Sequence, residues 1–285
     1  MTRPNVAVPG LGGKTAVVTG TAHGIGAAIA EALRGDGAVV YGVDRDAADL
    51  TSPGAVRQFF AGVGPVDILV NNAGGSDANA LGSGLAERND GGLTALGRRA
   101  VARMNKLGLA IDVSHSGDRT ALDTCAQSDR PVFITHAGAR AVWDTPRMKA
   151  DDVLRGVAVT GGVIGMSAAP HTTLSAGHPR HSIESVMDHF RYCADLVGID
   201  RVAFGPDTLY GDHVALHRIF AHLLAIGAMR GPSFDPVAYV DGLENPTENF
   251  PNICGWLVQH GYTDAEIKAV LGGNIYRVLQ SIWIA

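Results

Sequence analysis

Two stretches decide the fold of the C-terminal part of the chain: residues 109–115, LAIDVSH, and residues 131–136, PVFITH. Each is a short apolar run, the pattern of a buried β-strand, and they end in His115 and His136. A third apolar run, RVAFGP, is followed by Asp207. Because the strands of successive βα units end at one mouth of a parallel sheet or barrel, we expect these three side chains to face one site.

The composition is that of a globular α/β protein. The chain has 285 residues, 46% of them hydrophobic and 18% charged, and its net charge of −5 gives no reason to expect nucleic acid or an anionic membrane as a partner. Three scattered cysteines favour a reducing compartment, and neither a secretory signal nor a run of about 18 apolar residues is visible. We therefore expect a cytoplasmic protein that binds neither membrane nor nucleic acid. Whether it forms a homo-oligomer is left open.

The first 75 residues alternate short apolar runs with helical spacing. Strands are expected at residues 15–20, 38–44 and 67–74, with helices from 26 to 33 and from 55 to 60. This βαβαβ order predicts a parallel sheet with right-handed crossovers.

A glycine-rich turn follows the first of these strands. Gly20, Gly24 and Gly26 stand where glycine lets the backbone turn tightly and approach a pyrophosphate at a helix N-terminus. Asp44 ends the second strand and could accept hydrogen bonds from a ribose 2′-hydroxyl, which favours NAD, and Asn72 ends the third. The plainer alternative is that the glycines serve only the turn and the packing of the helix.

Taken together, TGxxxGIG, Asp44 and the NNAG of residues 71–74 resemble the N-terminal part of short-chain dehydrogenases/reductases, over about residues 12–75. The resemblance implies a truncated Rossmann-like segment that binds NAD through the residues named above. The Tyr-x-x-x-Lys pair that transfers protons in that family is absent, because no tyrosine has a lysine four residues on. NAD binding without redox catalysis is therefore kept as the alternative function.

Residues 75–92 are rich in Gly, Ser, Asn and Asp and lack a period, which indicates a seam between a unit at 1–75 and a unit at 76–285. Apolar residues recur at helical spacing from Leu93 to Leu107, which predicts a helix, and Gly108 can cap its C-terminus. Strands are then expected at residues 109–115, 132–137, 162–167 and 202–207. The total of about seven strands is one short of a closed eight-stranded barrel.

The two histidines have the chemistry of metal ligands. Neutral imidazole binds zinc well, and two ligands from successive βα units can share one ion. A single histidine is more often an ordinary core or surface residue, but both His115 and His136 end apolar strands. Asp207 could be a ligand or a proton carrier, with helix capping as its alternative.

Nine segments of the C-terminal part, in chain order, resemble the membrane (renal) dipeptidase family over about residues 77–285. They are GLTALG (92–97), MNKLG (104–108), IDVSH (111–115), FITH (133–136), GGVIG (161–165), FGPD (204–207), GLEN (242–245), FPN (250–252) and LGGN (271–274). The resemblance implies most of an amidohydrolase-type TIM barrel that uses zinc to cleave dipeptides or related amides. It implies that His115 and His136 bind the second metal, that Arg147 grips the substrate carboxylate, and that Asp207 carries the proton.

The chain also departs from that family. No His-x-Asp pair for the first metal occurs before His115, and the bridging glutamate is missing, with Glu87 the nearby carboxylate of the right type. We therefore expect a dipeptidase-like metallohydrolase, active or degenerate, with as few as one zinc ion and a small dipeptide-like substrate. A further hypothesis is that the three N-terminal strands stand in for missing barrel strands.

Overall fold

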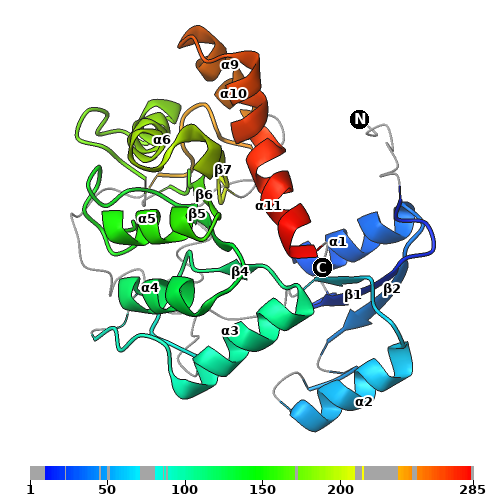
Figure 1. Cartoon of the computed structure of the whole chain (residues 1–285). Helices are drawn as coiled ribbons and strands as arrows, with labels where there is room; N and C mark the ends of the chain where they lie inside the picture. The colour runs from blue at the N-terminus through cyan, green and yellow to red at the C-terminus, as the bar shows by residue number, and fades with distance from the viewer. Residues whose placement is uncertain are drawn as a thin grey trace. The chain divides into compact units, whose positions relative to one another are not determined.

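The computed structural model of the protein describes residues 10–22, 24–44, 46–49, 52–70, 81–85, 87, 89–170, 173–208, 214, 237–245 and 249–283. The chain divides into two compact units, Met1–Gly75 and Ser76–Ala285. The strands form two separate sheets, one in each unit (Figure 1). The hypothesis that the three N-terminal strands stand in for missing barrel strands stays a prediction.

The N-terminal unit is built on a three-stranded parallel sheet with β1 in the centre, in the order β2-β1-β3. This confirms the expected βαβαβ alternation. The order differs from the sequential order of a barrel and reverses at β1, as in doubly wound sheets, where the order 2-1-3 is of the flavodoxin type. Its elements are β1 (Thr15–Thr19), α1 (Gly24–Gly35), β2 (Val39–Val43), α2 (Pro53–Val63) and β3 (Ile68–Val70).

The C-terminal unit is built on a four-stranded parallel sheet in the sequential order β4-β5-β6-β7. Sequential order is that of a TIM barrel, but four strands are half of the eight, so the described part holds less of a barrel than the sequence predicts. Its elements are α3 (Ala95–Leu107), β4 (Ile111–Asp112), α4 (Asp118–Gln127), β5 (Val132–Ala137), α5 (Asp151–Val159), β6 (Val163–Met166), α6 (Ile183–Val197), η1 (Ile199–Arg201), β7 (Val202–Phe204), α9 (Pro251–Gln259), α10 (Asp264–Lys268), η3 (Ala269–Gly273) and α11 (Asn274–Trp283).

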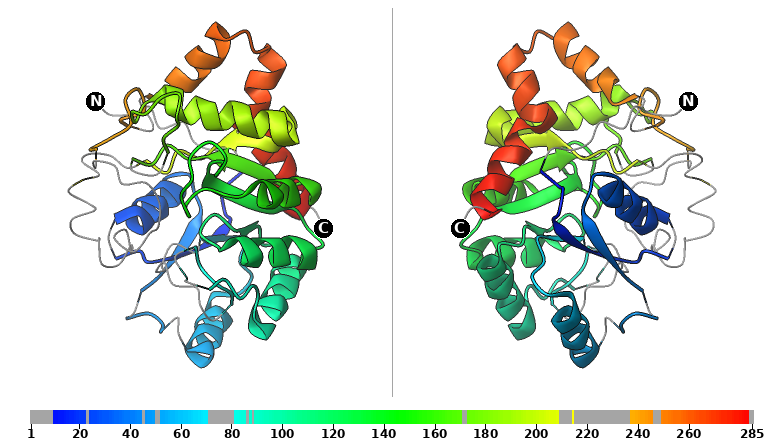
Figure 2. Two further views of the ribbon diagram at one scale, coloured as in Figure 1. Left: turned by 90° about the vertical axis from the view of Figure 1, so that its left-hand side faces the viewer. Right: turned by 90° about the vertical axis from the view of Figure 1, so that its right-hand side faces the viewer.

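Both faces of the four-stranded sheet are covered. Successive side chains of a strand point to opposite faces, so Ile134 of β5 joins the large core with Leu154 of α5 and Phe190 of α6. Phe133 of the same strand instead packs with Val278 of α11. The views in Figure 2 show α4, α5 and α6 along one side of the strands and α11 on the other. Packing on both faces leaves the carboxyl ends of the strands to carry the site.

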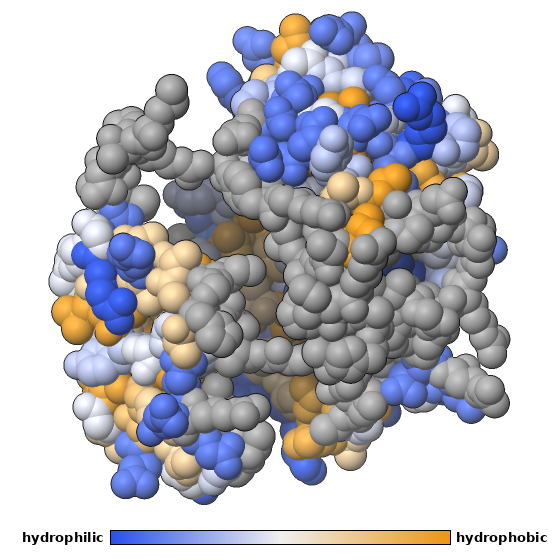
Figure 3. All heavy atoms as spheres, turned by 180° about the vertical axis from the view of Figure 1, so that it is seen from behind, coloured by the Kyte–Doolittle hydropathy of each residue, from blue (hydrophilic) through white to orange (hydrophobic). Residues whose placement is uncertain are grey.

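Helix ends are set by local capping interactions, of which the sequence predicts the one at Gly108. Thr94 caps α3 by accepting a hydrogen bond from Gly97 N, and Gly108 ends that helix in the left-handed conformation (φ 67°). Thr263 and Glu266 form a reciprocal capping box at α10. Over the upper region of the face seen in Figure 3, around α9 and α10, the surface is mostly hydrophilic. Of the helices described, none combines the length and apolar character needed to cross a bilayer.

Candidate functional site

The structure brings together the three side chains that end the apolar runs. His115 follows β4, His136 lies near the end of β5, and Asp207 follows β7. The Nε2 atoms of the two imidazoles are 2.9 Å apart, and Asp207 Oδ2 lies 3.8 Å from His136 Nε2. Parallel strand order thus delivers three potential ligands or proton carriers to one mouth of the sheet, as the strand-end argument predicts.

Asp207 has an unusual backbone. With φ of 55°, it is the one non-glycine residue with positive φ in the described ranges. The left-handed conformation costs an ordinary residue about 1–2 kcal/mol, and aspartate is among the side chains that tolerate it. Such strain gathers at functional sites, where the surrounding fold holds it in place.

Arg147 is buried against the same strand ends. It is 3% exposed, its Nη1 donates to Ser114 O at 3.2 Å, and its Nη2 donates to His136 O at 2.8 Å. Nη2 also lies 3.7 Å from Asp207 Oδ2. The guanidinium therefore holds the ends of β4 and β5 together and places a fixed positive charge beside the aspartate.

The surroundings keep both imidazoles neutral. Burial, followed by the positive charge of Arg147 and the proximity of His136, lowers the pKa of His115 to about 3. Burial also lowers the pKa of His136, against the opposing influence of Asp207. At neutral pH each ring therefore offers a lone pair, which is the state that binds a metal.

The described residues fit one metal ion better than two. Two imidazole nitrogens 2.9 Å apart can both reach an ion at the usual zinc–nitrogen distance of about 2.0–2.1 Å. Within the described ranges, however, no group of three or more His, Cys, Asp or Glu side chains is arranged as a metal site. Glu87 is exposed in the loop before α3. A single ion with two histidines, and Asp207 nearby, is what this geometry supports.

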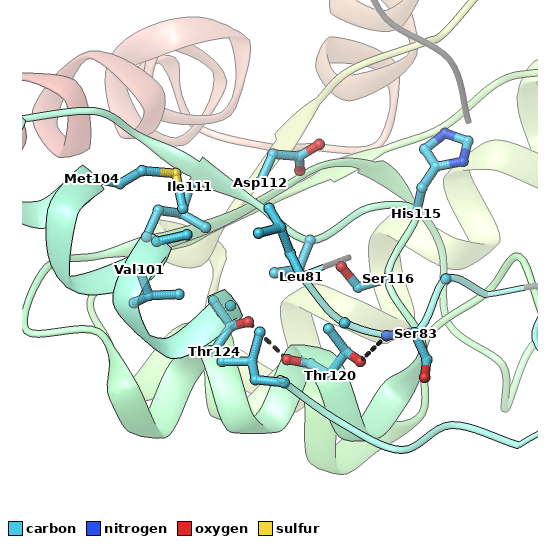
Figure 4. Close-up of a pocket in the computed structure, with 16 residues that line it drawn as sticks. Leu81, Ser83, Val101, Met104, Ile111, Asp112, His115, Ser116, Thr120 and Thr124 are labelled. Carbon is cyan, nitrogen blue, oxygen red and sulfur yellow. Dashed lines mark hydrogen bonds between the residues drawn. The ribbon is translucent and has the colours of Figure 1, made fainter. Parts of the chain in front are cut away.

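An apolar hollow of about 210 Å³ adjoins His115 (Figure 4). Leu81, Val101, Met104 and Ile111 point toward it from the loop before α3, from α3 and from β4, while His115 and Asp112 lie at its edge. Such a mostly apolar cavity with a few polar groups beside it is typical of sites for small ligands.

Sequence reasoning missed the polar residues behind the histidines. Asp112, Ser114 and Thr135 connect His136 to the end of β4 through hydrogen bonds. Their signal was present in the spacing Asp-x-Ser-His before the first histidine. Lys149, fully buried and donating to Ser116 O at 2.5 Å, had no such signal.

In the N-terminal unit the predicted nucleotide residues have local partners. Gly20 has φ of 72° and its N–H donates to Val43 O, so the turn itself requires glycine. The Asp44 carboxylate accepts a hydrogen bond from Thr21 Oγ1 at 2.7 Å. Gly24 and Gly26 begin α1, and Asn72 lies outside the described residues. The turn and the helix account for these positions without a bound nucleotide.

The model of the membrane dipeptidase family, peptidase family M19, matches residues 27–219, more than half of the chain. The match begins inside the segment that resembles short-chain dehydrogenases/reductases, and it lends that resemblance no support. Among curated proteins, an uncharacterized dipeptidase of Schizosaccharomyces pombe is 29% identical over 80% of this chain and 49% of its own length. Dipeptidase verJ of Clonostachys rogersoniana is 27% identical over 81% of this chain and 52% of its own. The chain thus spans about half the length of these relatives.

Solved structures agree on the fold. An amidohydrolase from Pseudomonas aeruginosa has a TM-score of 0.64 at 25% identity and covers 94% of this chain and 79% of its own. A metallo peptidase from Rhodobacter sphaeroides, liganded with a phosphinate mimic of the dipeptide L-Ala-D-Ala, has a TM-score of 0.59 at 21% identity, with coverage of 90% and 67%.

Proposed function

Since this chain belongs to the membrane dipeptidase family, peptidase family M19, we propose that it is a dipeptidase-type metallohydrolase with one zinc ion held by His115 and His136. The observation that supports this most directly is the pair of neutral imidazoles with Nε2 atoms 2.9 Å apart at the mouth of a parallel sheet. Neutral imidazole nitrogens are ligands that zinc favours, and two at this separation can supply two of the four ligands that it usually takes.

Asp207 and Arg147 would transfer the proton and bind the substrate carboxylate. When bound, zinc would supply a Lewis acid that lowers the pKa of water. Asp207, 3.8 Å from His136 Nε2, takes the proton of the attacking water and returns it to the leaving amine. Arg147 presents a planar cation that suits a substrate carboxylate, because the guanidinium fork meets both oxygens.

The substrate we propose is a small dipeptide or related amide. The apolar hollow beside His115 would receive one side chain, and a volume of about 210 Å³ limits it to a modest apolar group. The cytoplasm is the location we propose, because three scattered cysteines suit a reducing compartment.

The test is the zinc content of the purified protein together with hydrolysis of apolar dipeptides, with and without added zinc. His115→Ala and His136→Ala should each lose the metal and the activity. His178→Ala is the matched control, because His178 pairs with Asp188 away from the site and its loss should leave both unchanged. Full-chain protein that takes up no zinc at micromolar concentration would overturn the proposal.

A second candidate is that the Met1–Gly75 unit binds NAD. It is favoured by the reversal of strand order at β1, the point at which doubly wound sheets bind their ligands. Calorimetric titration of the protein with NAD and with NADP decides, and the absence of heat with both would remove it.

A further inference from the structure

A continuous chain of hydrogen bonds lies behind His136. Its Nδ1 is 2.8 Å from Thr135 Oγ1, which is 3.1 Å from Ser114 Oγ, which is 2.6 Å from Asp112 Oδ1. Ser114 is fully buried, so its hydroxyl is shielded from water. The chain crosses from β5 to β4 and ends on a carboxylate.

The carboxylate fixes the direction of every bond in this chain. An ionised carboxylate only accepts, so the one hydroxyl hydrogen of Ser114 goes to Asp112. Ser114 Oγ must then accept, both from His136 N–H at 3.1 Å and from the Thr135 hydroxyl. With its own hydrogen committed to Ser114, Thr135 Oγ1 can only accept from the imidazole.

We infer that Asp112, acting through Ser114 and Thr135, fixes neutral His136 as the tautomer protonated at Nδ1. Its Nε2, the atom 2.9 Å from His115 Nε2, then always carries the lone pair that faces the mouth of the sheet. All three are positioning residues that act on His136 without touching the substrate. The tautomer claim stands on the hydrogen bonds alone, and only its consequence for zinc rests on the proposed function.

The consequence for the metal follows from the tautomer. A histidine whose distal nitrogen is held as a donor presents a preformed ligand, and the loss of such a partner typically costs about 10–100-fold in metal affinity. The side chain of Thr135 is exposed, so replacing it breaks the hydrogen-bond chain without disturbing the packing of the core.

The experiment measures the nitrogen-15 chemical shifts of the histidine rings in the metal-free full chain, where protonated and lone-pair nitrogens are clearly separated. The His136 signals are assigned by their loss in His136→Gln. The wild-type protein and Thr135→Ser should show the proton on Nδ1. Thr135→Val, which keeps the shape and removes the hydroxyl, should shift the population toward the Nε2 proton and weaken zinc binding about 10–100-fold. Circular dichroism checks that each variant is folded.

Two results would overturn the inference: a proton on Nε2 in the wild-type protein, or an unchanged Nδ1 proton in folded Thr135→Val. If the wild-type tautomer is as inferred and Thr135→Val alters it, but no variant binds zinc, the inference stands and the proposed hydrolase function fails. If zinc binds with equal affinity to all three proteins, the consequence for the metal is wrong.

Discussion

Lys149 is buried completely, and its charge should make the stability of the protein depend on pH. Its Nζ donates to Ser116 O, and burial, followed by the charge of Arg147, lowers its pKa to about 7. The unfolded chain keeps the usual lysine pKa of about 10.4. Between these values the unfolded state binds more protons than the folded state, so the free energy of unfolding rises with pH, with a slope of up to about 1.4 kcal/mol per pH unit. Below about pH 7 both states hold the proton and the slope vanishes.

We expect Lys149→Met to remove this dependence. The substitution keeps an unbranched side chain as far as the Cε position and deletes the charged amine. The free energy of unfolding of the variant therefore rises relative to that of the wild type at low pH, and this difference shrinks as pH rises above 7. Loss of the hydrogen bond to Ser116 O lowers the free energy of unfolding of the variant by about 1–3 kcal/mol at every pH. It does not change how that free energy varies with pH.

Urea denaturation of both proteins from pH 6 to pH 10 measures the difference in unfolding free energy. Other titrating groups are common to the two chains and largely cancel. Lys268→Met, a change at an exposed lysine, is the control and should give a pH-independent difference. Parallel curves for wild type and Lys149→Met would refute the reasoning.

Three further outcomes are expected. Gly205→Ala should lower the free energy of unfolding by about 1–3 kcal/mol in urea, because its Cβ would lie 1.9 Å from Thr135 O, whereas Gly255→Ala meets no neighbouring atom and lacks this clash. Asp207→Asn should reduce kcat for dipeptide hydrolysis about 100–10,000-fold with zinc content unchanged, and a loss of zinc would instead make Asp207 a ligand. Phe190→Ala should cost about 3–5 kcal/mol because the ring is fully buried in the main core, and a loss below 1 kcal/mol in the same titration would contradict that packing.

The sequence predicts the positions of the strands better than their lengths. β5 forms over the expected residues 132–137, since its apolar run is unbroken. β4 was expected over 109–115 and forms only at Ile111–Asp112. The reason is local, because Asp112 Oδ1 accepts hydrogen bonds from Ser114 N and Thr135 N and so replaces the ladder with side-chain bonds.

Strand order and long-range contacts are harder to predict from the sequence. A βαβαβ pattern does not say on which side of β1 the third strand pairs, so the order β2-β1-β3 emerges only in the structure. The convergence of His115 and His136 follows from strand ends alone. The chain from His136 to Asp112 depends instead on the register Asp112↔Phe133 between two strands, which the sequence does not encode locally. Lys149, between Met148 and Ala150, likewise resembles a surface position in the sequence, although the fold buries it.

Arg147 has a consequence for how tightly a ligand could be held. A free arginine side chain has about 2 kcal/mol of rotamer entropy to lose on immobilisation. Here the carbonyls of Ser114 and His136 already restrain the guanidinium before anything arrives. The conformational entropy of the Arg147 side chain has therefore already been lost during folding. The binding of an anion here would not have to pay most of that entropy cost again.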